Sequence, residues 1–314
     1  MKTENLDRAT LAAFATTVLL GGLNAIGIRF TVMELPPFWG ATMRFVPAAL
    51  LLFIIAQAFR LPMPRGRSLL GAILFGALGV GLNFGFIYFG LQKVQPGIAQ
   101  VILGLVPLLT LLFALAQGLE KFRWQALAGA LLALAGIGIV FGGQIRANVP
   151  FLYLLAVVMG AVCFAESGII IKKFPQSHPI TMNVVAMATG SVILFLMSLI
   201  FNETRAIPVQ ATTWAALAYL VVFGSCVLFI LLFFVLKRWT ASANSYSFVL
   251  LPFVSITASA FLIQESLSLD MLAGAVLVLA GVYFGAIYAP SKRLEAVSPP
   301  PLTAELINEP CPEN

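Results

Sequence analysis

Residues 91–136 read LQKVQPGIAQVILGLVPLLTLLFALAQGLEKFRWQALAGALLALAG, and residues 236–281 repeat them in degenerate form as LKRWTASANSYSFVLLPFVSITASAFLIQESLSLDMLAGAVLVLAG. All the matches lie at one offset of about 145 residues, which is the mark of an internal repeat. Each copy predicts a helix with a central Pro, a short charged link that carries a Glu, and a second helix rich in small residues. The matched positions are Pro107 with Pro252, Glu120 with Glu265, Leu127 to Ala130 with Leu272 to Ala275, and Ala135-Gly136 with Ala280-Gly281.

The composition excludes a soluble globular fold. The chain has 314 residues, of which 61% are hydrophobic and only 10% are charged, whereas soluble domains carry about 25% charged residues. The formal net charge of +6 does not indicate a nucleic-acid partner, because the Lys and Arg residues stand between apolar runs and form no continuous patch. We therefore expect the lipid bilayer to be the solvent of most of the chain.

Ten stretches are apolar enough to cross a bilayer, whose hydrocarbon core of about 30 Å needs about 20 helical residues. The links between them are short, so we expect successive helices to be antiparallel neighbours. All four Trp residues fall near predicted span ends, as in a membrane-interface belt. The predicted spans are 9–30, 36–59, 68–90, 96–118, 122–142, 150–171, 179–201, 211–236, 240–263 and 267–289.

The distribution of positive charge predicts the orientation. With the N-terminus inside, about 13 Lys and Arg residues fall in inside segments and about 4 in outside links, which predicts that both termini are cytoplasmic. Five spans per half is an odd number, so the second half enters the membrane in the opposite sense. The predicted fold class is an all-α polytopic membrane protein with ten transmembrane helices in two inverted five-helix repeats, 9–142 and 150–289. Residues 290–314, rich in Pro and Glu, predict a disordered cytoplasmic tail.

Residues for catalysis or metal binding are scarce. Asp occurs only as Asp7 and Asp270, both at span ends, and His178 is the only His. The three Cys show no C-x-x-C spacing, and no G-x-x-x-x-G-K-[ST] stretch is present. We therefore expect no enzyme activity, no metal, no cofactor and no ATP-driven transport by this chain alone.

Two charges lie within predicted spans. Arg44 follows PPFW in span two on a helix face of small residues, so we expect it to point into the bundle. It would attract a carboxylate or phosphate, or else donate to backbone carbonyls or extend to the membrane surface. Glu166 is the acid placed furthest inside a span. It is a candidate for proton coupling or for binding a substrate amine, or else it pairs with Lys172 or Lys173.

Polar amides lie on glycine-lined helix faces. Asn24, Asn83 and Gln100 each share such a face, which predicts either a cavity wall or a hydrogen bond between helices. Ser225 and Tyr246 are further cavity candidates, Tyr246 because span nine begins with the polar run ASANSYS.

Pro107 and Pro252 permit helix bends at matched positions and are hinge candidates, with a static kink as the alternative. Glu120 and Glu265 lie in matched links, where capping the next helix is the favoured interpretation. Pro-interrupted helices in corresponding positions of two halves indicate a transporter with its site between the halves.

The chain resembles the drug/metabolite transporter superfamily, and within it the ten-span EamA-type permeases. The resemblance rests on GGLNAIGIR in span one, PPFWGATMRF in span two and the paired P…E…LAGA…LAG blocks, and it covers residues 9–289. It implies a basket of ten helices with a cavity between helices one, three, four, six, eight and nine. Arg44 would then lie on helix two, outside that set. The residues on cavity helices would be Asn24, Asn83, Gln100, Glu166, Ser225 and Tyr246.

Bacterial members of this family resemble exporters of amino acids, related metabolites or drugs. We therefore expect a multi-pass transporter in the bacterial inner membrane that exports small amino-acid-like metabolites by alternating access. The alternative is an importer or exchanger of sugars, nucleosides or organic anions that draws on Arg44. A non-transporting sensor is less favoured, because the tail of about 25 residues is too short for an output domain.

Overall fold

The computed structural model describes residues 8–118, 124–175, 177–236, 241–264 and 268–284. Every regular element within these ranges is helical. The predicted tail 290–314, Glu120 and Glu265 lie outside the described residues.

The helices follow the predicted spans, with interruptions in spans three, four and eight. The first half comprises α1 (Arg8–Val32), α2 (Pro37–Ala58), α3 (Arg67–Phe75), η1 (Gly76–Leu82), α4 (Asn83–Gly90), α5 (Pro96–Leu103), α6 (Val106–Ala116) and α7 (Trp124–Arg146). The second half comprises α8 (Phe151–Lys172), α9 (Pro179–Ile200), α10 (Ala211–Val221), η2 (Val222–Val227), α11 (Leu228–Leu236), α12 (Ala241–Leu262) and α13 (Leu269–Val282). The elements η1 and η2 are π-helical turns that join their flanking helices into continuous rods.

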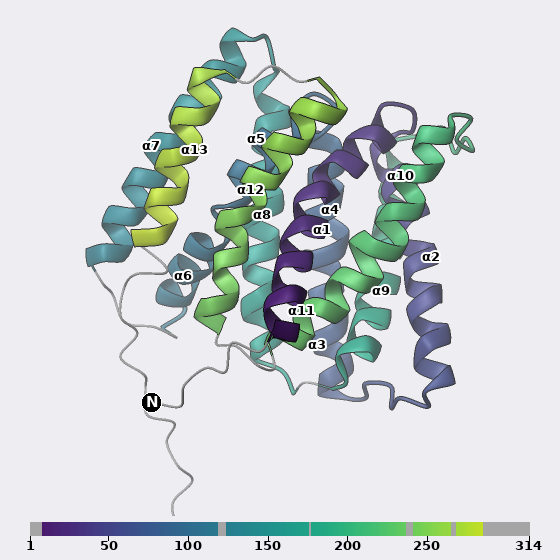
Figure 1. The fold of residues 1–314 in the computed structure, drawn as a ribbon. Helices are drawn as coiled ribbons and strands as arrows, with labels where there is room; N and C mark the ends of the chain where they lie inside the picture. The colour runs from purple at the N-terminus through teal and green to yellow at the C-terminus, as the bar shows by residue number, and fades with distance from the viewer. Residues whose placement is uncertain (1–7, 119–123, 176, 237–240, 265–267, 285–314) are drawn as a thin grey trace, which may run out of the picture.

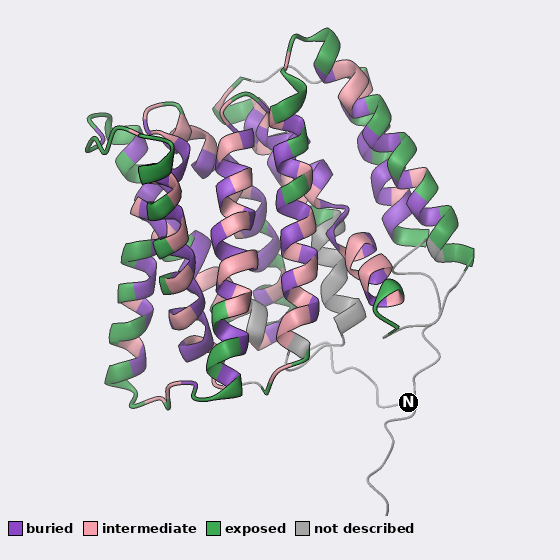
Figure 2. Cartoon of the chain, turned by 180° about the vertical axis from the view of Figure 1, so that it is seen from behind, coloured by how far each residue is buried: buried purple, intermediate pink, exposed green. Residues whose placement is uncertain are grey.

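Eight helical rods are long and apolar enough to cross a membrane, and two shorter apolar helices, Leu250–Leu262 and Leu269–Val282, accompany them in the described residues. The chain is therefore a polytopic membrane protein. Side chains on the outer faces of the rods are exposed and apolar, as Leu131, Ile200 and Phe261 illustrate, whereas the inner faces are buried (Figure 2). Such a surface is suited to lipid rather than to water.

Helix boundaries follow from the local sequence. Pro37, Pro96 and Pro179 each open a helix, where the missing N–H removes no helical hydrogen bond. Four described helices are each followed, two residues after the last helical residue, by a non-glycine residue in the left-handed conformation that reverses the chain, and α6 is followed in the same way by Gly118 with φ of 69°. The four non-glycine residues are Arg60, Asn148, Asn202 and Gln264, with φ of 50, 60, 51 and 56°.

Helices from the two halves of the sequence pack on one another. The helices α7 and α13 lie side by side at one edge of the bundle (Figure 1). A Cβ on Gly136 would lie 2.7 Å from the carbonyl oxygen of Gly274, and one on Gly281 would lie 2.5 Å from that of Gly129. The contacts are reciprocal, because Gly129 and Gly136 correspond to Gly274 and Gly281 at the repeat offset of about 145 residues.

The remaining helices also pair across the halves. The helix α1 packs on α12 and on α10 and α11, α4 packs on α8, and α2 packs on α9. Glycine faces make the close contacts, as where Gly21 of α1 meets Leu251 and Gly90 at the end of α4 meets Val157. The predicted glycine faces of α1 and α4 therefore serve as packing surfaces between the halves.

Candidate functional site

Two π-helical turns at matched positions organise the polar interior. Gly79 in η1 and Gly224 in η2 lie about 145 residues apart, at the repeat offset. Their carbonyls accept hydrogen bonds from side-chain amides, Gly79 from Asn83 at 3.1 Å and Gly224 from Asn24 at 3.4 Å. A π turn breaks the regular i to i−4 pattern, and such turns are frequent at functional sites. Both turns lie near the middle of their spans, where polar groups are costly and usually functional.

Arg44 is completely buried beside the second π turn. Its Nε donates to Ser225 Oγ and its Nη2 donates to the Gly224 carbonyl, each at 3.0 Å. The guanidinium carbon lies 4.7 Å from the ring centroids of both Phe45 and Phe84. A desolvated cation over an aromatic ring gains about 2 kcal/mol. These contacts explain how a cation is accommodated inside the bundle.

Three of the predicted residues therefore meet at one point. Arg44 and Ser225 are in direct contact, and Asn24 shares the Gly224 carbonyl with Arg44. The expectation that Arg44 points into the bundle is confirmed. The resemblance placed its helix outside the cavity set, yet its side chain reaches α4 and η2, which belong to cavity helices three and eight.

Several polar atoms in this region are buried without a protein partner in the described part of the chain. They are Nη1 of Arg44, the hydroxyl of Tyr88, and the side-chain oxygens of Asn24 and Asn83. The Tyr88 hydroxyl lies beside the Arg44 guanidinium. The set contains one cationic donor and two amide oxygens. The oxygen of Asn24 lies against Gly224 of η2, and that of Asn83 lies near Gly160 of α8.

Gln100 joins α5 to α1 rather than to the π turns. Its Nε2 donates to the Gly21 carbonyl at 3.2 Å, next to the Leu20 carbonyl, which accepts from Tyr219 Oη at 2.7 Å. Sequence reasoning missed Tyr88 and Tyr219. No spacing in the sequence marks them, because Tyr88 is five residues after Asn83 and so does not share its helix face.

Glu166 lies at the predicted cytoplasmic end of the bundle. Both of its carboxylate oxygens accept from Gln117 Nε2 at 3.0 Å, and Lys173 donates to the amide oxygen of the same Gln117. Gln117 follows α6, so Glu166 connects α8 to the first half. The Gln117 amide therefore lies between Glu166 and Lys173, and both interpretations of Glu166, proton coupling and pairing with a Lys, stay predictions.

The two hinge candidates differ in their surroundings. Pro107 is the second residue of α6, just after the break at Gly104 and Leu105 that separates α5 from α6. Pro252 lies within the continuous helix α12 and lines an apolar groove of about 120 Å³ between α12 and α13. Exposed side chains, among them Phe253 and Val276, form this groove, so it faces outward from the polar region. The side chain of Tyr246 lies outside the described residues.

The predicted outer end carries two carboxylates that sequence reasoning did not single out. Glu203, after α9, accepts from the backbone N–H groups of Phe38 and Trp39 at 3.1 and 2.7 Å, at the start of α2. Glu34, before α2, accepts from the N–H groups of Val209 and Gln210 at the start of α10. Anions are favoured at helix N-termini.

Glu34 has a perturbed ionisation. Hydrogen bonds from the Thr213 hydroxyl and the Val209 N–H lower its pKa below the ordinary 4.5. The loop before α2 therefore supplies Glu34 to the start of α10, and the loop after α9 supplies Glu203 to the start of α2.

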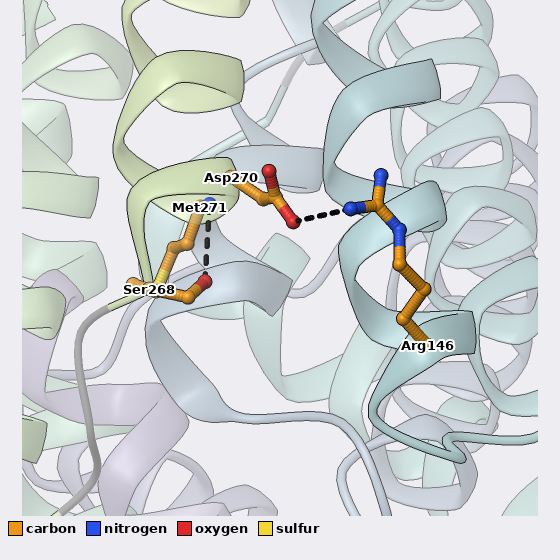
Figure 3. A network of polar contacts seen from close by, with 4 residues as sticks. All are labelled: Arg146, Ser268, Asp270 and Met271. Atoms are coloured by element: carbon orange, nitrogen blue, oxygen red, sulfur yellow. Dashed lines mark hydrogen bonds and ion pairs between the residues drawn. The ribbon is translucent and has the colours of Figure 1, made fainter.

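The edge pair of helices has its own polar contact at this end. Arg146 of α7 lies 3.6 Å from Asp270 of α13, and Ser268 caps α13 by accepting from the Met271 N–H at 3.2 Å (Figure 3). Both ionic side chains are substantially exposed, so the pair contributes little to stability. Among the described residues, no group of three or more His, Cys, Asp or Glu could hold a metal ion.

The comparisons with known proteins agree with this architecture. A transporter of Archaeoglobus fulgidus, named only as uncharacterized, is 26% identical over 86% of this chain and 95% of its own length. The inner membrane transporter YedA of Escherichia coli K12, likewise named uncharacterized, is 29% identical over 86% of this chain and 88% of its own length. A solved crystal structure with 21% identity superposes with a TM-score of 0.63, over 90% of this chain and 99% of that chain. That structure supports the fold alone.

The family assignment covers both halves. The sequence matches the EamA-like transporter family over residues 8–142 and again over residues 151–286. The two matched segments together span most of the chain. The resemblance noted in the sequence is thereby confirmed, and the chain belongs to the EamA-like transporter family.

Proposed function

We propose that the protein is a ten-span secondary transporter of the bacterial inner membrane, built as two inverted five-helix repeats with both termini in the cytoplasm. The reciprocal glycine contacts of α7 and α13 support the pseudo-two-fold relation, because such an axis requires that residue i meets j′ wherever j meets i′. The matched π turns support it as well.

The substrate that the site supports best is a small amino-acid-like metabolite, moved outward by alternating access. The observation that carries this proposal is the set of buried groups without protein partners near the π turns. Arg44 offers a cationic donor for a carboxylate, and Asn24 and Asn83 offer amide oxygens for an ammonium group. Burying such groups without partners costs about 1–3 kcal/mol each, so a ligand that satisfies them would recover that free energy.

One alternative has its own support. Arg44 has no acidic partner within 4.0 Å among the described residues, so the region around it is electropositive. An exchanger of organic anions would use that charge without needing an ammonium site. Transport of a carboxylate that lacks an amine distinguishes the two.

Alternating access requires parts that bend. Pro107 follows the helix break in span four, and Pro252 lies inside α12 at the repeat-related position, where a Pro permits a bend, so both remain the proposed hinges. Glu166 is the proposed proton-coupling residue. It joins α8 to the end of α6 through Gln117, so a change in its charge would alter a contact between the halves.

The proposal is tested by transport in liposomes that contain the purified protein. We expect efflux of at least one labelled amino acid, faster with an imposed pH gradient. Glu166→Gln should abolish the acceleration and leave exchange intact, whereas Asp270→Asn, a matched loss of a carboxylate at the edge pair, should leave both unchanged. Transport that responds neither to the gradient nor to Glu166→Gln would refute proton coupling, and absence of amino-acid transport would refute the substrate class.

A further inference from the structure

We propose that Arg44 couples substrate binding to the movement of η2. In the empty transporter its guanidinium holds the π turn against α2, and on binding it exchanges Gly224 and Ser225 for the carboxylate of the substrate. This inference rests on the proposed function for the identity of the carboxylate, and it adds the residue and the exchange through which binding is transmitted.

The π turn η2 is attached to α2 at three consecutive residues. The Gly224 carbonyl and the Ser225 hydroxyl both accept from Arg44 at 3.0 Å. The thiol of Cys226 then lies 3.8 Å from the Ala48 carbonyl, one turn after Arg44. Arg44 and Ser225 are completely buried, and Cys226 is nearly so. The guanidinium therefore makes two of the three polar contacts that fix this turn on its neighbour.

The matching turn η1 is held by close packing of backbone on backbone. A Cβ on Gly76 of η1 would lie 2.5 Å from the Ala186 carbonyl oxygen of α9, and one on Gly190 of α9 would lie 3.0 Å from the Gly81 nitrogen. Backbone packs on backbone there, and no ligand can compete with such a contact. Of the two turns, η2 is the one held by a side chain that a ligand can draw away.

A carboxylate is a stronger hydrogen-bond acceptor for Arg44 than the two groups that it contacts in this structure. The present acceptors of Arg44 are a neutral carbonyl and a neutral hydroxyl, and Nη1 has no protein acceptor among the described residues. A carboxylate accepts two parallel hydrogen bonds from a guanidinium, and charge-assisted bonds are about twice as strong as neutral ones. The buried Tyr88 hydroxyl beside Arg44 is available as an additional donor.

Release from Arg44 would allow η2 to change its helical register. A π turn contains one residue more than the corresponding α-helical path. Once Gly224 and Ser225 are released, η2 can rewind as α-helix, which shifts the register between α10 and α11 by one residue. One residue corresponds to a rotation of about 100° and a translation of about 1.5 Å. Because α11 packs on α1, this rotation would reach the helix that carries Asn24.

The direct test is hydrogen exchange of the backbone amides of Val222–Val227 in full-length protein in lipid nanodiscs. The probe is a mixture of the twenty L-amino acids, and the matched control is the mixture of their carboxamides, which lack the anionic group. We expect the acids to accelerate exchange in η2 about tenfold, because the released turn interconverts between its π and α-helical registers and its backbone hydrogen bonds open at each interconversion. Loss of one charge-assisted bond to Arg44 favours that opening by at least about 1.4 kcal/mol, which corresponds to a factor of ten. The amides should leave exchange in η2 unchanged, and exchange in η1 should not respond to either mixture.

Two variants with opposite expected effects separate coupling from a structural role. Arg44→Lys keeps the positive charge but loses the planar guanidinium that can bind both carboxylate oxygens. The KM for a carboxylate substrate should therefore rise about tenfold. Ser225→Ala removes one competitor for the guanidinium, so KM should fall while exchange in η2 becomes faster without ligand. Thr42→Val is the control, because the Thr42 hydroxyl donates to the Phe38 carbonyl within α2 and its loss removes no hydrogen bond between α2 and η2. If Ser225→Ala raises KM, Arg44 is a structural pin and the inference is wrong.

The outcomes also separate this inference from the proposed function. If no amino acid is transported, a mixture of short-chain monocarboxylates and dicarboxylates replaces the amino acids in the exchange experiment. Faster exchange in η2 with these acids supports the role of Arg44 and refutes amino acids as substrates. If neither mixture changes exchange in η2, the coupling role of Arg44 is refuted, whatever the protein transports.

Discussion

The carboxylates of Glu34 and Glu203, at the predicted outer end, accept from backbone N–H groups. Glu34 binds the start of α10 through Val209 and Gln210, and the Thr213 hydroxyl adds the largest contribution to its lowered pKa. Because the pKa is lower in the folded protein, Glu34 adds stability above its ordinary pKa of 4.5, and this stability is lost as the pH falls through the lowered value.

The measurement is chemical unfolding of wild type and Glu34→Gln in detergent micelles, from about pH 7 to about pH 3. Wild type should be the more stable protein at neutral pH, and the difference should disappear at the acidic end. Both proteins keep Glu203, so its contribution cancels. A difference that stays constant across the range would show that the carboxylate charge is not what holds α10.

For single residues, the sequence predicts which side chains point inward but not which groups they contact there. Arg44 was predicted to point inward because it lies on a face of small residues, and it does. Its partners were not predictable, because one is the Gly224 carbonyl, and every residue of the chain has a carbonyl. The site therefore follows from which carbonyls a π turn leaves available, and that depends on backbone geometry.

At the scale of helices, the pair α7 and α13 depends on glycine at the contact and tolerates change beside it. A Cβ on Gly136 would lie 2.7 Å from the Gly274 carbonyl oxygen, whereas one on Gly138 would have no neighbour within 4 Å. Gly136→Ala should destabilise the protein by about 1–3 kcal/mol through overpacking. Gly138→Ala should be neutral or stabilise it by up to about 1 kcal/mol, because Ala is the better helix former.

The two substitutions are identical in chemistry and two residues apart on one helix, so their comparison isolates the contact. Thermal unfolding in the same detergent is the measurement. Equal stability of the two variants would mean that α7 and α13 do not meet at these glycines.

The sequence predicts the membrane-spanning helices but not the π turns within them. Hydropathy and Pro positions locate the spans, since each needs about 20 apolar residues. The π turns escape prediction, because GALGVGL and VFGSCV are apolar stretches without Pro or charge, and Gly is common in regular transmembrane helices. The break between α5 and α6 lies at Gly104 and Leu105, just before Pro107. Both residues keep right-handed helical φ and ψ, with ψ of −19 and −17°, and Pro107 follows as the second residue of α6.

For the whole molecule, an inverted repeat predicts that equivalent links lie on opposite sides of the membrane. The link between α2 and α3 and the link between α9 and α10 are equivalent in the two halves. Pro62→Cys should therefore react with an impermeant maleimide only from the cytoplasm, and Thr204→Cys only from outside. Cys163 and Cys226 are buried, and Cys311 would be replaced by Ser in both variants. Labelling of both positions from the same side would refute the inversion.

The crossed capping of α2 and α10 has a consequence for biosynthesis. The start of α2 is held by Glu203, which lies 165 residues after Phe38 in the chain. At about 5–20 residues per second, the ribosome reaches Glu203 on the order of ten seconds after it has passed α2. During that interval the first N–H groups of α2 remain at the membrane surface with water as their partner. The first half therefore enters the bilayer before it can complete its own helix ends, and the nascent protein matures only when the loop after α9 emerges.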